Sequence, residues 1–140
     1  MRRDERARFD ALFEEELGRL PAALHALLEE VPVVLEDHPP PQLLRELGLD
    51  PDDPAGLCGL HSGIPLTERS VSQPGMPEVI TLFREGILDE AGGWDEWTDE
   101  DGSELGGAAR IRREIRVTLL HEIGHHFGLG EEDLERLGYA

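Results

Sequence analysis

The sequence predicts a single α+β domain that spans residues 1–140. Three observations indicate this fold class. Apolar residues recur at helical spacing near the N-terminus, β-branched runs follow in the middle of the chain, and a long helical pattern leads into the segment from His121 to Glu131. A chain of 140 residues buries about two thirds of the surface that it exposes when unfolded, which is enough for one core without disulfides.

The N-terminal region is expected to contain two helices. Apolar residues recur at helical spacing, with charged residues between them, at Phe9, Leu12, Phe13, Leu17 and Leu20. Gly18 and Pro21 are expected to end this first helix, because glycine weakens a helix interior and proline is favoured at the start of the next helix. A second short helix is therefore expected to begin at Pro21 and to run toward Val31.

The middle of the chain contains the expected strands. Residues 31–36 form a β-branched run in which Pro32 indicates an edge strand, because proline cannot donate to a sheet ladder. Residues 41–47 predict a short helix, and residues 57–66 suit a strand and turn. Residues 78–85 are the clearest strand, since they are rich in β-branched and aromatic side chains.

Residues 91–104 combine six acidic residues with two tryptophans. We interpret this segment as a solvated loop with one or both tryptophans folded onto the core, since tryptophan is usually largely buried. The alternative is a lid or docking loop whose tryptophans grip a partner.

The C-terminal region predicts a long helix followed by a short one. From about residue 108, apolar residues recur at helical spacing, arginines occupy the outer face, and the pattern continues into His121. A rigid helix of about twenty residues suits a metal site, because packing fixes the rotamers of the ligands. Residues 131–138 predict the last helix, with Leu134 and Leu137 on its buried side.

The segment from His121 to His125 has the spacing of a metal site. Residues four apart on a helix are separated by about 400°, which is one turn plus only about 40°, so the rings of His121 and His125 can converge on one ion. Glu122 is turned about 100° from His121, which lets it hold a water beside the ion without being a ligand. This pattern is typical of zinc hydrolases, so we predict Zn²⁺ as the cofactor and Glu122 as the catalytic base.

The third ligand is expected from the residues that follow. A continued helix would carry Glu131 about 15 Å along the axis from His121 and away from the metal. Gly128 stands where a left-handed turn can end the helix, so Glu131 can return toward the ion. Glu131, Glu132 and Asp133 are the possible ligands, and Glu131 is our prediction.

The other histidines near the motif and the single cysteine have structural interpretations. His126 points about 100° away from His125, so packing or support of the ligands is expected of it rather than ligation. His61 lies on a predicted strand, where a hydrogen bond to its surroundings is expected rather than a role in a cleft. Cys58 is the only cysteine and is interpreted as a small buried residue, in agreement with a reducing compartment.

The charge balance restricts the expected partners. The chain has 31 acidic residues against 13 basic ones, giving a net charge of −18 at pH 7. Such a charge repels phosphate backbones and anionic lipid, so neither a nucleic acid nor a membrane surface is an expected partner. The charged N-terminus and the lack of a run of about 18 apolar residues favour a cytoplasmic location, and the oligomeric state stays open.

The segment from His121 to Glu131 is similar to the zincin metallopeptidase signature, and its glycine followed by a ligand resembles the metzincin clan. The chain as a whole resembles the small bacterial zincin-like metallopeptidases described as minimal metzincins, and the likeness extends to residues 63–69, 80–84 and 137–139. This resemblance implies a compact zincin-like α+β domain with a small mixed sheet, a zinc site and hydrolysis of peptide bonds. In zinc peptidases of this type an edge strand beside the metal pairs with extended substrate, and residues 79–85 are the expected strand.

Two features depart from the metzincin pattern. Metzincins have a histidine where this chain has Glu131, and the small family usually has an aspartate there. Metzincins also have a methionine turn beneath the metal, whereas Met1 and Met76 both lie upstream. A carboxylate ligand cancels one unit of metal charge, so slow hydrolysis is expected. Tyr139 is a candidate oxyanion donor, although packing of the C-terminal helix is the favoured interpretation.

The expected function is zinc-dependent hydrolysis of a peptide or protein substrate, and two alternatives stay open. One bacterial endoribonuclease family has the similar pattern H-x-x-x-H-x-x-G-x-x-H, but it lacks the glutamate base and favours RNA, which the charge of −18 opposes. The other alternative is a metal-stabilised interaction module with vestigial hydrolysis, in which residues 91–104 contact a protein partner.

Overall fold

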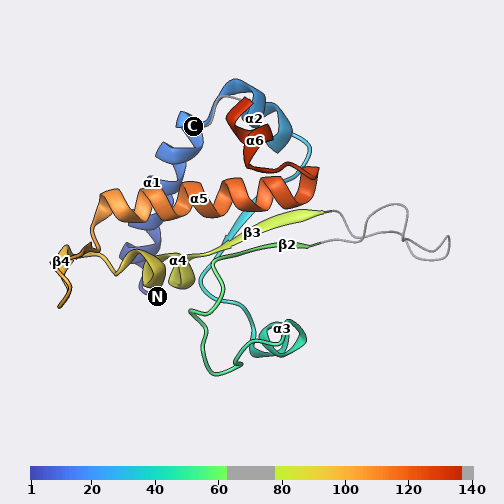
Figure 1. Cartoon of the computed structure of the whole chain (residues 1–140). Helices are drawn as coiled ribbons and strands as arrows, with labels where there is room; N and C mark the ends of the chain where they lie inside the picture. Colours follow the sequence, from blue (N-terminus) through green and yellow to red (C-terminus); the bar gives the residue numbers. More distant parts are fainter. Residues whose placement is uncertain (63–77, 137–140) are drawn as a thin grey trace.

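The computed structural model describes residues 1–62 and 78–136 of the chain (Figure 1). Within these ranges the elements follow one another as α1 (Arg3–Arg19), α2 (Ala22–Leu28), β1 (Val33–Glu36), α3 (Pro41–Glu46), β2 (Gly59–Ser62), β3 (Val79–Phe83), α4 (Arg84–Ala91), β4 (Trp97–Thr98), β5 (Glu104–Leu105), α5 (Ala108–Phe127) and α6 (Glu131–Arg136). The α+β class expected from the sequence is confirmed. Among the described helices, none combines the length and the apolar character needed to cross a membrane.

The larger sheet has three strands in the order β1-β3-β2. β1 runs parallel to β3 and β2 runs antiparallel to it, so that Val33 and His61 both lie opposite Ile80. β3 is the central strand, and the side chains of Ile80 and Leu82 are fully buried. β1 is an edge strand, as Pro32 indicated, and Pro32 contributes its carbonyl oxygen, which accepts the Ile80 N–H at 3.0 Å.

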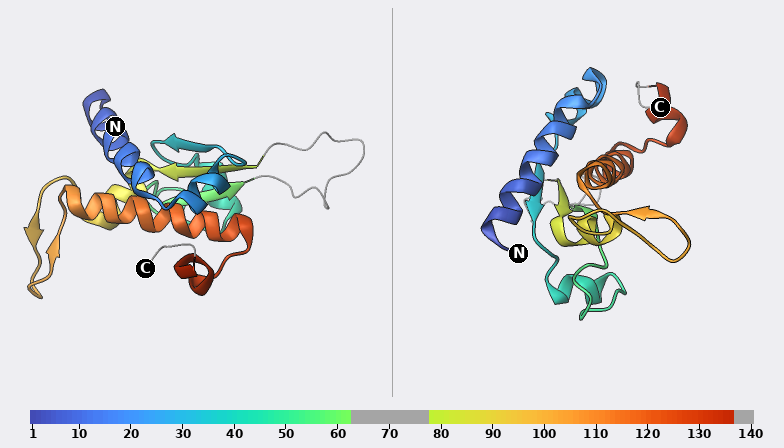
Figure 2. Two further views of the ribbon diagram at one scale, coloured as in Figure 1. Left: turned by 90° about the horizontal axis from the view of Figure 1, so that it is seen from above. Right: turned by 90° about the vertical axis from the view of Figure 1, so that its left-hand side faces the viewer.

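Helix α5 is the element against which most of the fold packs. It lies along β2 and β3 and also contacts α1 and α4, while α3 lies on the other side of the strands (Figure 1). The views in Figure 2 show α1 crossing α5 at a steep angle. The shared core takes side chains from α1, α5 and the sheet, among them Phe9, Phe13, Ile80, Leu82, Ile115, Leu119 and Ile123.

The structure corrects two expectations for residues 79–85. The strand ends at Phe83, and the next residues form α4, which the sequence pattern did not indicate. Gly86 lets this helix approach the preceding loop, because a Cβ there would overlap the carbonyl oxygen of Leu57. β3 is also paired on both sides, since β1 joins it in parallel, so it is not the sheet edge expected to bind extended substrate. The edge strand beside α5 is β2.

The acidic segment 91–104 ends in the short hairpin of β4 and β5. Trp94 packs against the core, with the guanidinium carbon of Arg8 4.5 Å from the centre of its ring. Trp97 is 49% exposed, and its indole N–H donates to the carbonyl oxygen of Gly92 at 2.8 Å. One of the two tryptophans is therefore folded onto the core, as we interpreted.

Candidate metal centre

His121 and His125 lie one turn apart on α5, and their rings approach each other. The ring centroids are 4.2 Å apart and the ring planes are inclined by 61°. Both side chains are exposed, whereas Glu122 between them is buried. The ligand-type atoms of these three residues lie within 4.8 Å of one another. The local geometry expected from the spacing is therefore present.

The position of these side chains is fixed by the packing of α5. Ile111, Ile115, Leu119 and Ile123 are fully buried on the opposite side of the helix, at intervals of four residues. Because these residues are buried in the core, α5 cannot rotate about its axis without exposing them. His121 and His125 are therefore held on the side of the helix that borders a cavity.

Gly59 explains why Glu122 is buried. It lies on β2, and a Cβ built on it would come within 2.8 Å of Thr118 Cγ2 and 3.2 Å of Glu122 Cγ. The missing side chain lets β2 lie directly against the first part of the Glu122 side chain. The Glu122 carboxylate stays 3.9 Å from Nδ1 of His125, which is too far for a hydrogen bond.

The motif borders a cavity of about 530 Å³ between α5, β2 and the loop after α3. Much of its wall is apolar, and the lining residues include Leu47, Leu49, Leu57, Leu60 and Val117 as well as the three motif residues. Cys58 also lines it, and burial raises the pKa of its thiol to about 11. The thiol is therefore protonated at neutral pH. His61 is a further lining residue, although a role in a cleft was not the favoured interpretation.

The predicted end of α5 is confirmed. Gly128 adopts φ 67° and ψ 31°, the left-handed conformation that glycine allows at low cost. The N–H of Leu129 then donates to the carbonyl oxygen of Gly124 at 2.8 Å, which closes the turn. Gly124 itself must be small, because a Cβ there would lie 2.9 Å from the Leu129 oxygen.

The three acidic residues proposed as the third ligand open α6. Glu131 and Glu132 are exposed, and among the described residues the group formed by the motif does not include either of them. Asp133 has other partners, since it accepts the N–H of Gly130 at 3.0 Å and pairs with Arg136 at 3.0 Å. Glu131 and Glu132 are alike in being exposed, and Glu131 stays our prediction. Residues 63–69 and Tyr139 lie outside the described residues.

A comparison with protein families matches residues 28–139 to the zincin-like metallopeptidases. The matched range covers most of the chain and includes the whole segment from His121 to Glu131. This chain belongs to the zincin-like metallopeptidase family. A search of curated proteins finds no match. The resemblance seen in the sequence is confirmed, and the family supports a hydrolase of the peptidase type.

Zinc is the metal that the zincin-like family implies, and the donors at this site fit it. Imidazole nitrogens and carboxylate oxygens are common zinc ligands, and His121 and His125 supply two such nitrogens on one face of α5. Their exposure leaves the ring edges accessible from the cavity.

Proposed function

We propose that this zincin-like protein is a zinc-dependent peptidase in which Glu122 is the general base. One observation carries the proposal: two exposed imidazoles and one buried carboxylate meet at the wall of a single cavity. His121 and His125 would hold the ion, with Glu131 as the proposed third ligand. When bound, zinc supplies Lewis acidity toward a water and toward the substrate carbonyl.

Glu122 would handle the proton of the attacking water. Its carboxylate has no hydrogen-bond partner at His125, because the separation is 3.9 Å, so an oxygen is available to accept that proton. The same oxygen would return the proton to the amine nitrogen as the carbon–nitrogen bond breaks, so that a neutral amine leaves. β2 restricts the movement of this side chain through its contact at Gly59.

The cavity would accept a short stretch of extended peptide. Its volume of about 530 Å³ is in the range of pockets that hold small ligands. β2 contributes Gly59, Leu60 and His61 to the wall and is an edge of the three-stranded sheet. We propose that substrate backbone adds to this edge, which would bring a peptide bond past Glu122.

Replacing Glu122 by glutamine tests the proposal. The Glu122→Gln variant should keep its zinc, because Glu122 is not a proposed ligand, while hydrolysis of a fluorogenic peptide library should fall by roughly 10²–10⁴-fold. Glu14→Gln is the matched control, since Glu14 is an exposed residue of α1. Unchanged hydrolysis in Glu122→Gln would remove Glu122 from the mechanism.

A further inference from the structure

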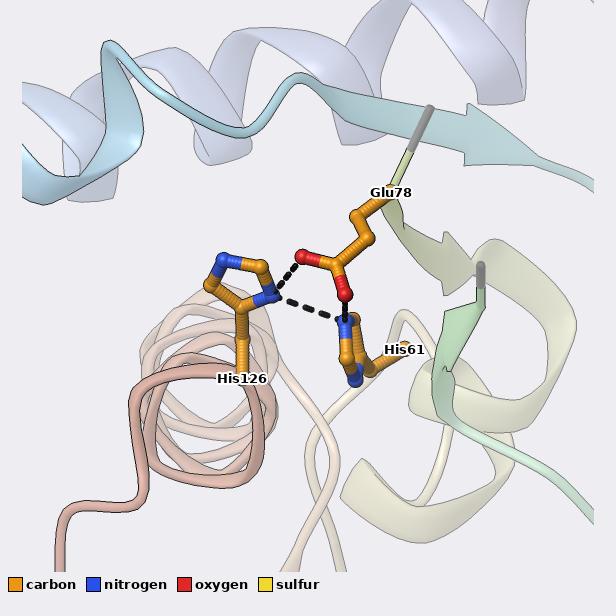
Figure 3. A group of neighbouring side chains, drawn as sticks. All are labelled: His61, Glu78 and His126. Carbon is orange, nitrogen blue, oxygen red and sulfur yellow. Dashed lines mark hydrogen bonds and ion pairs between the residues drawn. The ribbon is translucent and has the colours of Figure 1, made fainter. Parts of the chain in front are cut away.

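A second group of metal-ligand side chains lies at the C-terminal end of α5. His126 from α5, His61 from β2 and Glu78, which immediately precedes β3, point toward one another (Figure 3). Nδ1 of His126 is 2.8 Å from Nε2 of His61 and 3.0 Å from Oε2 of Glu78, and His61 Nε2 is 3.9 Å from Oε1 of Glu78. Three segments that are distant in the sequence therefore converge on one point.

Hydrogen bonding alone satisfies this group poorly. Nδ1 of His126 carries at most one hydrogen, yet both a ring nitrogen and a carboxylate oxygen lie within hydrogen-bond distance of it. The side chains are also largely shielded from water, with exposed fractions of 10% for His126, 20% for His61 and 26% for Glu78. A single cation between the three side chains would accept a lone pair from each of them at once.

We infer that His61, Glu78 and His126 bind a divalent transition-metal ion, in a site separate from His121 and His125. Ligands of tetrahedral zinc at about 2.0–2.2 Å from the ion are roughly 3.3 Å from one another. The two ring nitrogens are 2.8 Å apart, and the Glu78 carboxylate approaches His126 with Oε2 at 3.0 Å and His61 with Oε1 at 3.9 Å, so small side-chain movements would complete the site. Two imidazoles and one carboxylate favour zinc over calcium or magnesium.

The surroundings favour a cation at this point. His126 lies in the last turn of α5, where the helix dipole places partial negative charge. Phe127 packs edge-on against the His126 ring, with centroids 4.3 Å apart, and limits the ring's rotation. The net charge of −18 adds a general attraction for positive ions.

An ion bound here would join parts of the fold that the motif does not connect. It would tie the end of β2 and the start of β3 to the end of α5, next to His125. It would also fix His61, which lines the cavity used by the proposed peptidase site. The expected role is to stabilise the wall of that cavity, so this ion need not take part in the reaction.

Zinc stoichiometry tests the inference without measuring activity. After equilibrium dialysis against buffered zinc, the unmodified chain should hold two equivalents, and Glu78→Gln should hold one. Glutamine keeps the size of Glu78 but is a poor ligand, so the fold should be retained, as circular dichroism can verify. The double variant His121→Ala/His125→Ala should also hold one equivalent of zinc. The triple variant that adds Glu78→Gln should hold none. His38→Ala is the matched control, because His38 lies outside both groups and should leave the stoichiometry at two.

Thermal melting gives an independent measurement. Zinc should raise the melting temperature of His121→Ala/His125→Ala, because an ion that binds only the folded state stabilises it, and Glu78→Gln should abolish this rise. If His121→Ala/His125→Ala holds no zinc and shows no rise, the second site is overturned and the proposed function is untouched. If instead the unmodified chain holds one equivalent that only Glu78→Gln removes, the second site stands and the proposed peptidase site fails.

Discussion

Glu122 and the histidines beside it differ sharply in exposure. The side chain of His125 is 59% exposed while that of Glu122 is 8% exposed, although the residues are three positions apart on one helix. The difference arises because β2, through Gly59, covers Glu122 but leaves the imidazole rings at the cavity. This arrangement supports the proposed roles, in which the exposed histidines reach the ion and the buried Glu122 is held in place as the base.

The third ligand can be identified by single substitutions in the first turn of α6. Glu131→Ala should weaken zinc binding at the motif by at least about 100-fold, because the loss of a ligand should exceed the 10–100-fold loss typical of a residue that supports one. Glu132→Ala and Asp133→Ala are the comparisons, and each should change the affinity much less. Competition with a chromophoric chelator measures these affinities. A larger loss in Glu132→Ala or Asp133→Ala would move the ligand to that residue.

Asp37 makes stability depend on acid pH. The hydrogen bond from Arg6 is the main cause that lowers the pKa of Asp37 below its usual 3.8, and Arg84 contributes to the same effect. The ionised carboxylate therefore stabilises the fold fully above pH 3.8, and this contribution is lost as pH falls through the lowered pKa. Asp37→Asn should reduce the free energy of unfolding at neutral pH by about 1 kcal/mol.

Urea denaturation at several pH values checks this prediction. The difference between Asp37→Asn and the unmodified chain should shrink as the pH falls below 3.8. Glu14→Gln is again a suitable control, since Glu14 is exposed and should show no such trend. A difference that grows toward acid pH would contradict the assigned role of Asp37.

At the level of elements, the turn that ends α5 sets where α6 begins. A Cβ at Gly128 would meet nothing within 4 Å, so the cost of Gly128→Ala comes from the left-handed backbone alone, at φ 67°. This substitution should lower the free energy of unfolding by about 1–2 kcal/mol. Gly18→Ala in α1 is the matched control and should instead stabilise the protein by roughly 0.5–1 kcal/mol, because alanine favours a helix interior. Equal effects of the two substitutions would show that the turn imposes no backbone requirement.

The elements differ in how far the sequence could predict them. The range of α5 followed from its apolar periodicity, and its end followed from Gly128, because both signals are local. α4 was missed, since its first residues, Arg84 and Glu85, extend a run that reads as strand. The central position of β3 depends on parallel pairing with β1, a contact that no local pattern encodes.

The two groups of ligand-type side chains also differ in whether local sequence signals or contacts between distant segments bring them together. His121, Glu122 and His125 lie within one helical turn, so their spacing alone predicted their convergence. His61 lies on β2, His126 lies on α5 and Glu78 immediately precedes β3, so only the pairing of β2 with β3 next to α5 brings them together. The hydrogen bond expected of His61 is present, but its partner is another histidine far along the chain.

In the whole molecule, α5 contributes both to the hydrophobic core and to the proposed metal site. Its buried side belongs to the core shared with α1 and the sheet, and its other side carries the motif at the cavity. The family match over residues 28–139 supports a peptidase of the zincin type. The alternative of an interaction module would gain support if a chelator lowered the melting temperature while no peptide in a broad library was cleaved.

Crystals grown with zinc provide the most direct test of the metal centre. An anomalous difference map at the zinc edge should contain a peak about 2.0–2.1 Å from a ring nitrogen of both His121 and His125. Glu122 should not be a ligand of that ion. A map with no peak between these two rings would contradict the proposed zinc peptidase.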